Sequence, residues 1–216
     1  MKKLLIKEAR LAASPLSFVF VAGAFITLIP QGYPLLVGSF FVTLGIFYSF
    51  INWREINDII YSLLLPVRKK DVVKAKFLFV SLLETAAFIL QAAVTLVRMA
   101  FLSEASAGNP LMNANGLFLA FSLIVFAAYN LVFVGGFFTT SYKAGVPFII
   151  YSVVCFLIIG VGEALHYFPG LEFLNTATFE NSGVGFIALA TSAAVFVGVT
   201  VLACKKAEKR FENTDF

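Results

Sequence analysis

The chain has 216 residues, of which 60% are hydrophobic and 13% charged, and phenylalanine alone supplies 26 of them. Soluble domains carry about 25% charged residues, and a soluble fold of this length cannot bury so much apolar surface. The composition therefore excludes an ordinary soluble enzyme, a disordered tail and a disulfide-stapled secreted domain. It indicates an integral membrane protein with little mass outside the bilayer.

The net charge is +4, the two cysteines are Cys155 and Cys204, and the single histidine is His166. Both cysteines lie in or at the end of apolar runs, so a disulfide framework is not predicted. No Cys/His cluster has metal-ligand spacing, so a metal site is not predicted either. In a membrane protein the position of the basic residues matters more than their sum. We therefore expect the chain to lie in a lipid bilayer, and we do not expect it to bind nucleic acid.

The first 14 residues predict a short amphipathic helix on the cytoplasmic membrane surface. Lys7, Glu8 and Arg10 interrupt the apolar run that a signal peptide needs after a basic start. Lys3, Lys7 and Arg10 share one helical face, and leucines are available for the others. The alternative is a basic tail that only orients the first span.

Six segments are apolar enough for membrane helices, which need about 20 residues each. They cover residues 15–29, 34–51, 72–102, 116–138, 144–162 and 183–204. The first two are separated by a turn with Pro30, Gly32 and Pro34, so they form a hairpin that crosses the membrane or re-enters it. The predicted fold class is an all-α, polytopic membrane protein in which residues 1–216 form a single transmembrane domain.

The basic residues orient this topology. Fifteen of the 16 Lys and Arg residues fall on one side of it, and the exception is Arg98. The loops of the other side carry Glu104, Glu163, Glu172 and Glu180. Because basic residues mark cytoplasmic loops, both termini, including the tail 205–216, are predicted to be cytoplasmic in the cell membrane, and residues 163–182 are predicted to lie outside.

Residues 52–71 form the one cytoplasmic loop with a distinctive pattern. Its apolar residues recur at helical spacing, at Ile56, Ile60, Leu63 and Leu64. Pro66 cannot continue a helix, so a short helix ends near Leu65, and Asp71 is the expected N-cap of the next span. Such a helix is held between two spans. If a soluble partner binds it and moves it, the two spans move with it. The alternative is a surface helix that only anchors the loop.

The string Glu55-x-Asn57-Asp58-Ile59-x-Tyr61-x-x-Leu64-Leu65-Pro66-Val67-x-Lys69-Lys70-Asp71-Val72-Val73-x-x-Lys76 resembles the signature of a small bacterial ABC-2-type transporter permease family. The plan of the chain is similar too, with a basic N-terminal helix, six spans and this loop between the second and third. The resemblance implies a type V ABC exporter-like fold, an N-terminal elbow helix and a re-entrant outer segment at 163–182.

The resemblance also implies a function. Such permeases pair with a second permease subunit, identical or homologous, and with ABC ATP-binding subunits, and they export amphipathic or hydrophobic substrates such as peptides, antibiotics or lipid-like molecules. The coupling helix would carry Glu55, Asn57, Asp58, Tyr61, Leu64 and Pro66. The chain has no Gly-x-x-x-x-Gly-Lys-Ser/Thr phosphate loop, so it is not expected to be an enzyme or to bind a cofactor, and ATP and Mg would bind the partner ATPase.

The third predicted span carries a polar stripe of Glu84, Gln91 and Arg98, spaced by seven residues. Ionisable groups within a span usually face a partner or a wet cavity, so the stripe predicts a substrate path or the seam between two permeases. The alternatives are that Arg98 snorkels to outer head groups and that Glu84 and Gln91 bond to neighbouring helices. Asn130 is expected to make a hydrogen bond between helices.

A different functional class remains open on the sequence alone. The chain could be an ATP-independent small membrane transporter or sensor with Glu84 as its titrating group. The internal repeats that many carriers show are not evident in the sequence.

Overall fold

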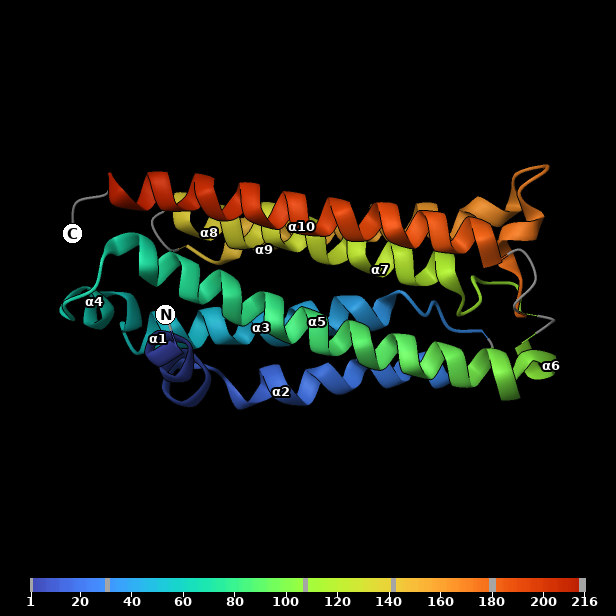
Figure 1. Ribbon diagram of the computed structural model, residues 1–216, viewed down its shortest axis with the longest axis horizontal. Coiled ribbons are helices and arrows are strands. Elements are labelled where there is room, and N and C mark those ends of the chain that lie inside the picture. Colours follow the sequence, from blue (N-terminus) through green and yellow to red (C-terminus); the bar gives the residue numbers. More distant parts are fainter. Residues whose placement is uncertain (1, 30–31, 107–108, 141–142, 179–181, 214–216) are drawn as a thin grey trace.

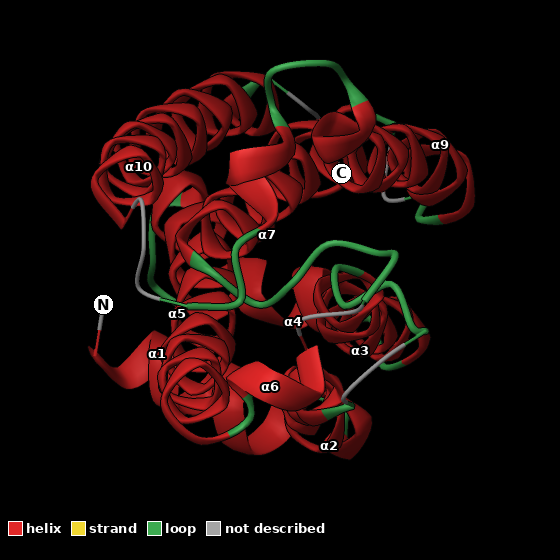
Figure 2. Cartoon of the chain, turned by 90° about the vertical axis from the view of Figure 1, so that its right-hand side faces the viewer, coloured by secondary structure: helices red, strands yellow, loops and turns green. Residues whose placement is uncertain are grey.

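The computed structural model describes residues 2–29, 32–106, 109–140, 143–178 and 182–213, and these form helices joined by turns. The helices run along one long axis, and α1 and the C-terminal end of α10 lie at the same end as α4 (Figure 1). The short helix α6 (Ser103–Ser106) lies at the opposite end. Seen end-on, α7, α9 and α10 form one group, and α2, α3 and α5 form another (Figure 2).

The N-terminal segment is helical, as predicted. Helix α1 (Lys2–Lys7) continues into a π-helical turn, η1 (Glu8–Ala12), and a bend separates these from α2 (Pro15–Val21) and the 3₁₀ helix η2 (Ala22–Leu28). The two parts, Lys2–Leu11 and Pro15–Leu28, meet at 92°. Pro15 occupies the first turn of α2, where its missing N–H costs nothing.

Helix α3 (Val37–Glu55) follows the predicted turn, of which Pro30 lies outside the described residues. It packs antiparallel on α2, where Ser17 Oγ donates to the Gly45 carbonyl at 2.7 Å. A side chain at Gly45 would collide with Phe20, so this glycine allows the close approach of the two helices. The chain then reverses at Asn57, whose φ of 52° is left-handed, into α4 (Asp58–Leu63).

The remaining helices match the predicted spans with shifted ends. They are α5 (Lys69–Phe101), the continuous run of α7 (Gly116–Ala128), η3 (Tyr129–Val134, π-helical) and α8 (Gly135–Thr139), then α9 (Gly145–Ala164) and α10 (Ser182–Glu212). Helix α10 extends into the predicted charged tail. The Asp71 N-cap prediction is wrong, because α5 starts two residues earlier and Asp71 lies in its first turn, paired with Arg68 at 2.9 Å.

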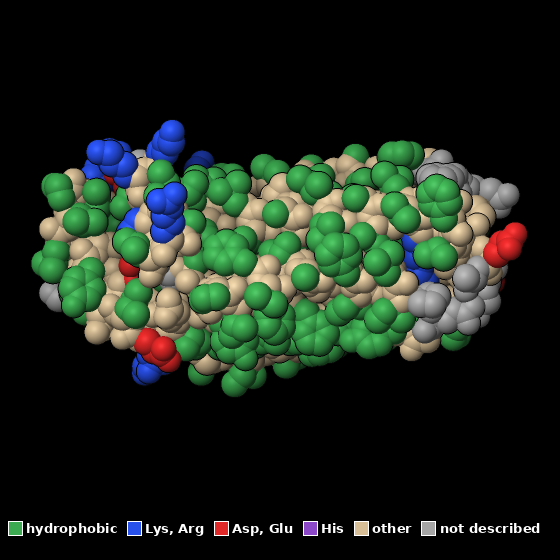
Figure 3. Space-filling view, turned by 90° about the horizontal axis from the view of Figure 1, so that it is seen from below, with side chains coloured by type: hydrophobic (Ala, Val, Ile, Leu, Met, Phe, Trp, Pro, Cys, Tyr) green, Lys and Arg blue, Asp and Glu red, His purple; other side chains and the backbone are tan. Residues whose placement is uncertain are grey.

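Four helices among the described residues are long and apolar enough to cross a membrane, and the bent pair Lys2–Leu11 with Pro15–Leu28 could supply a fifth. The predicted second span, now α3, is not one of the four, because Asn52, Arg54 and Glu55 occupy its last turn and shorten its apolar stretch. Hydrophobic side chains cover the middle of the molecule, while Lys and Arg gather mainly near the α4 end (Figure 3). The chain is therefore a multi-pass membrane protein.

The segment between α9 and α10 forms two short 3₁₀ turns, η4 (Leu165–Tyr167) and η5 (Glu172–Asn175). His166 lies in the first of them, half-buried, with Nε2 3.2 Å from the Pro110 carbonyl oxygen. The second is bound to the stretch before α7, because Asn113 Nδ2 donates to the Asn175 carbonyl at 3.0 Å and Asn115 Nδ2 donates to the Leu174 carbonyl at 2.9 Å. Residue Glu180 of the predicted outer segment lies outside the described residues.

Candidate functional site

A buried cluster of four charged residues joins three elements at the α4 end of the molecule. Lys76 of α5 lies 2.6 Å from Asp58 Oδ2 and 3.0 Å from Glu8 Oε2, measured from Nζ. Lys7 completes the cluster with ion pairs to Asp58 and to Glu8. The Lys76 side chain is fully buried, and those of Glu8 and Asp58 are 1% and 4% exposed. Two cations and two anions thus compensate one another away from water.

Aromatic and polar neighbours complete the coordination of this cluster. The Lys76 ammonium lies 3.7 Å from the centre of the Trp53 ring, at the end of α3. That distance is typical of a cation–π contact. Lys7 also donates to Ser62 Oγ at 2.7 Å, and Ser62 Oγ donates to the Asp58 carbonyl at 2.7 Å. The N-terminal helix, the end of α3, α4 and α5 therefore meet at one point.

Asp58 is held in its charged form. Burial alone would raise its pKa, but the positive charge of Lys76 and hydrogen bonds from Lys7 and Lys76 outweigh that effect and lower the pKa of Asp58 below the ordinary value. Because Asp58 is the first residue of α4, its carboxylate also lies at the positive end of that helix. The geometry makes Asp58 the residue that fixes α4 to the rest of the chain.

The opposite face of α4 is apolar and exposed. Ile60, Tyr61 and Leu64 are 54%, 65% and 77% exposed. Helix α4 itself lies at one tip of the molecule (Figure 1). Ile56 and Leu65 are exposed beside them. We call these five residues the α4 apolar face: Ile56, Ile60, Tyr61, Leu64 and Leu65. Exposed apolar surfaces of this kind mark protein–protein or membrane contacts.

The six predicted coupling residues lie together at this tip but do not share one role. Glu55 is the last residue of α3, and Asn57 forms the reversal into α4. Asp58 faces inward to the charged cluster, whereas Tyr61, Leu64 and Pro66 are exposed. The helix is shorter than expected and ends at Leu63.

Sequence reasoning missed the partners of Asp58, which are Lys7, Glu8 and Lys76. One signal was available for Lys76. It follows Val72 and Val73 by four and three residues, so helical periodicity places it on the same buried face. A lysine on an apolar face needs a buried acid, but the sequence does not say that Glu8, 68 residues away, would supply one.

The polar stripe of α5 lies inside the chain's own helix bundle. Glu84, Gln91 and Arg98 are all buried. Asn130 Nδ2 donates to Glu84 Oε2 at 2.7 Å and to Thr200 Oγ1 of α10 at 3.1 Å. The expected interhelical bond of Asn130 is thereby confirmed. Asn130 lies in the π-helical turn η3. Short π-helical turns inside helices often occur at functional sites.

The other two stripe residues contact different elements. Gln91 Nε2 donates to Ser39 Oγ of α3 at 3.0 Å, and Ser39 Oγ donates to Ser122 Oγ of α7 at 3.1 Å. Arg98 Nη1 donates to the carbonyls of Thr27 and Ile29 at 2.8 and 2.6 Å. Arg98 therefore caps the C-terminal end of η2, whose last carbonyls have no partner within the helix.

A comparison with known protein families shows which family the chain belongs to. A family model described as ABC-2 family transporter protein matches residues 3–206. The chain belongs to this family. No curated protein and no solved structure matches it. The family and the apolar helices together indicate the permease of an ABC transporter, a membrane subunit that works beside an ATPase partner.

Proposed function

We propose that this ABC-2 family chain is the permease subunit of an ATP-driven exporter and that its ATP-binding partner binds to the α4 apolar face. The observation that carries the proposal is the position of Asp58. It ties a helix with an exposed apolar face to a fully buried lysine of α5, the longest helix. A push on α4 is thereby transmitted to a helix that runs the length of the molecule (Figure 1).

The proposed topology has six crossings with both termini in the cytoplasm. Besides the four long helices, α2 with η2 and α3 would each cross once, at about 24 Å and about 28 Å in length. Both are short against a hydrocarbon core of about 30 Å. The bend of 92° before α2 supports a surface position for α1 and η1, as an elbow. The Lys and Arg side chains that gather near the α4 end support the orientation (Figure 3).

In this mechanism, ATP and Mg bind the partner subunits, and closure of the ATPase pair moves α4. Because Asp58 joins α4 to Lys7 and Lys76, the N-terminal helix and α5 move with it. A second permease subunit, identical or homologous, would complete the path, and the substrate would be an amphipathic or hydrophobic peptide, antibiotic or lipid-like molecule. The stripe of Glu84, Gln91 and Arg98 would then respond to the rearrangement by exchanging its interhelical bonds.

Reconstitution with and without the partner tests this proposal. The chain is co-expressed with candidate ABC ATP-binding subunits, purified through a tag on the permease and placed in proteoliposomes. We expect an ATP-binding subunit to copurify, ATP hydrolysis only when it is present, and hydrolysis stimulated by the permease. A permease-only preparation that transports substrate without ATP and retains no such subunit would refute the proposal.

A further inference from the structure

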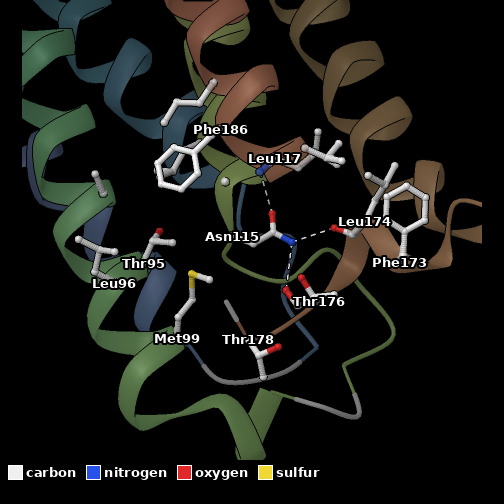
Figure 4. A pocket seen from close by; sticks show the side chains of 16 residues that line it. Thr95, Leu96, Met99, Asn115, Leu117, Phe173, Leu174, Thr176, Thr178 and Phe186 are labelled. Carbon is white, nitrogen blue, oxygen red and sulfur yellow. Dashed lines mark hydrogen bonds between the residues drawn. The ribbon is translucent and has the colours of Figure 1, made fainter. Parts of the chain in front are cut away.

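A second site lies at the end of the molecule away from α4, between α5, α7, α10 and the segment around η5 (Figure 4). It is a cavity of about 240 Å³. Its walls are mostly apolar, with Ala92, Leu96 and Met99 from α5 and Phe186 and Leu189 from α10. Apolar walls with a few polar groups are typical of small-molecule sites.

Two glycines close one wall of this cavity. Helices α7 and α10 cross at Gly116 and Gly185 so closely that a methyl group on Gly116 would lie 3.0 Å from Gly185 Cα. The cavity lies beside this crossing and is lined by residues of α5, α7 and α10. Leu96 and Phe186 line it and are 56% and 68% exposed. The opening between them therefore faces the lipid side of the bundle.

A polar group inside the cavity has no partner. The Thr95 side chain is 1% exposed, and its hydroxyl makes no hydrogen bond within the described part of the chain. Helical threonines usually donate to the carbonyl four residues before, and Thr85 of the same helix does so, to Ser81 at 2.7 Å. The Thr95 side chain lines the wall of the cavity beside Leu96, Met99 and Phe186 (Figure 4). A buried, unsatisfied hydroxyl is costly unless something bonds to it.

The depth of Thr95 indicates what that ligand is. Between Lys76 and Arg98 the only charged residue of α5 is Glu84, and this stretch is about 33 Å long, close to the thickness of the hydrocarbon core. Thr95 lies one turn inward from Arg98. In the leaflet away from α4, Thr95 therefore lies at the boundary between the hydrocarbon core and the head groups. The ester carbonyls of acyl lipids lie at this depth. Asn115 and Thr178 line the cavity nearer the end of the molecule.

We propose that this cavity binds one acyl chain from the leaflet away from α4, with its ester or amide carbonyl accepting a hydrogen bond from Thr95. The chain would run inward along Ala92 and Leu189, and the head group would lie toward Asn115 and Thr178. This site is separate from the coupling role of α4, and the binding experiment below needs no ATPase partner. The acyl chain can belong to a resident phospholipid or to an acylated cargo.

Photolabelling tests the site. The purified chain is placed in phosphatidylglycerol nanodiscs that contain a phosphatidylglycerol probe with a diazirine in one acyl chain, and labelled residues are mapped by mass spectrometry. We expect labels at Leu96, Met99 and Leu189, reduced at least fivefold in Ala92→Phe, which fills the cavity. The matched control is Ala93→Phe, one residue away on the exposed side of α5. Equal labelling in wild type and Ala92→Phe would overturn the site.

The role of Thr95 is tested with an ether-linked probe that lacks the carbonyl. In the wild type the ester probe should label the cavity at least threefold more than the ether probe, and in Thr95→Val the two should be equal. Thr95→Val is nearly isosteric, so it keeps the test valid if Ala92→Phe fails to fold. Equal labelling by both probes in the wild type would overturn the hydrogen bond and with it the proposed ligand.

Native mass spectrometry of chain purified from membranes identifies the source. Wild type should carry one bound molecule that Ala93→Phe retains and Ala92→Phe lacks. A phospholipid mass indicates a resident lipid, and the mass of another acylated compound indicates cargo; both agree with the site. The absence of any acyl-bearing molecule specific to the wild type and Ala93→Phe would contradict it.

Discussion

Lys76 of α5 and Asp58 of α4 form an ion pair of 2.6 Å, and both side chains are buried at the end of a membrane helix bundle. The pair links α4, whose other side carries exposed apolar residues, to α5, the longest helix of the described residues. Two charges removed from water stay stable only while both are present. The pair therefore acts as a fixed joint between α4 and α5.

Removal of Lys76 should be severe. Lys76→Met leaves Asp58 and Glu8 with Lys7 as the only nearby cation of the cluster, so we expect a loss of about 3–5 kcal/mol, as for one partner of a buried pair. Thermal unfolding in detergent measures it. The control is Lys74→Met, which removes a half-exposed lysine 3.7 Å from Glu208 and should cost at most about 1 kcal/mol. Equal losses of stability in the two variants would show that the buried cluster contributes no more to the free energy of unfolding than an exposed ion pair does.

The charged cluster should also make stability depend on pH. The lowered pKa of Asp58 means that its contribution is complete above the ordinary aspartate pKa of about 3.9 and disappears as the pH falls through the lowered value. Between pH 5 and pH 2, the melting temperature of wild type should therefore fall more steeply than that of Asp58→Asn, which is already less stable at pH 7. Parallel curves for the two proteins would contradict a lowered pKa.

Replacing Glu84 distinguishes the two functional classes. Glu84→Gln keeps an oxygen that accepts from Asn130, so we expect a change in stability of at most about 1 kcal/mol. ATP-driven transport in proteoliposomes should persist in this variant. If Glu84 were the titrating group of an ATP-independent carrier, a proton gradient alone would drive uptake in wild type and Glu84→Gln would abolish it. That second pattern would reject the permease proposal.

Arg98 should stabilise the N-terminal hairpin rather than the rest of the bundle. Arg98→Gln loses charged donors to the carbonyls of Thr27 and Ile29, at about 1.5–3 kcal/mol each. Hydrogen exchange of η2 should become at least tenfold faster, because local opening there becomes easier. Exchange in α9, which contains neither Thr27 nor Ile29, serves as the control. Unchanged exchange in η2 would mean that other contacts hold this helix.

Much of the fold could be predicted from the sequence, because apolar length and helix breakers act locally. Pro66 and the basic turn after it separate α4 from α5, as expected. The reversal at Asn57 was not predictable, because the left-handed conformation of a single asparagine depends on where α3 and α4 pack. For the same reason Glu55 ends α3 instead of lying in the short helix.

The site was predictable only in part. The six residues predicted to couple the chain to an ATPase lie at one tip, but the pattern did not separate the inward Asp58 from the outward Tyr61 and Leu64. That distinction depends on Lys7, Glu8 and Lys76, which reach Asp58 through tertiary packing. Likewise the spacing of the α5 stripe showed that its residues share a face. It could not show that Glu84 would bond to Asn130, Gln91 to Ser39, and Arg98 to the end of η2.

The most direct test of the central claim is the affinity of the permease for its ATP-binding subunit. Tyr61→Ala/Leu64→Ala removes exposed apolar groups from α4 and should leave the melting temperature unchanged. Phe168→Ala, exposed at the opposite end, is the matched control. We predict that the Kd of the complex in nanodiscs rises at least tenfold for the α4 variant, about 1.4 kcal/mol or more, and stays the same for Phe168→Ala. An unchanged Kd for Tyr61→Ala/Leu64→Ala would contradict the account.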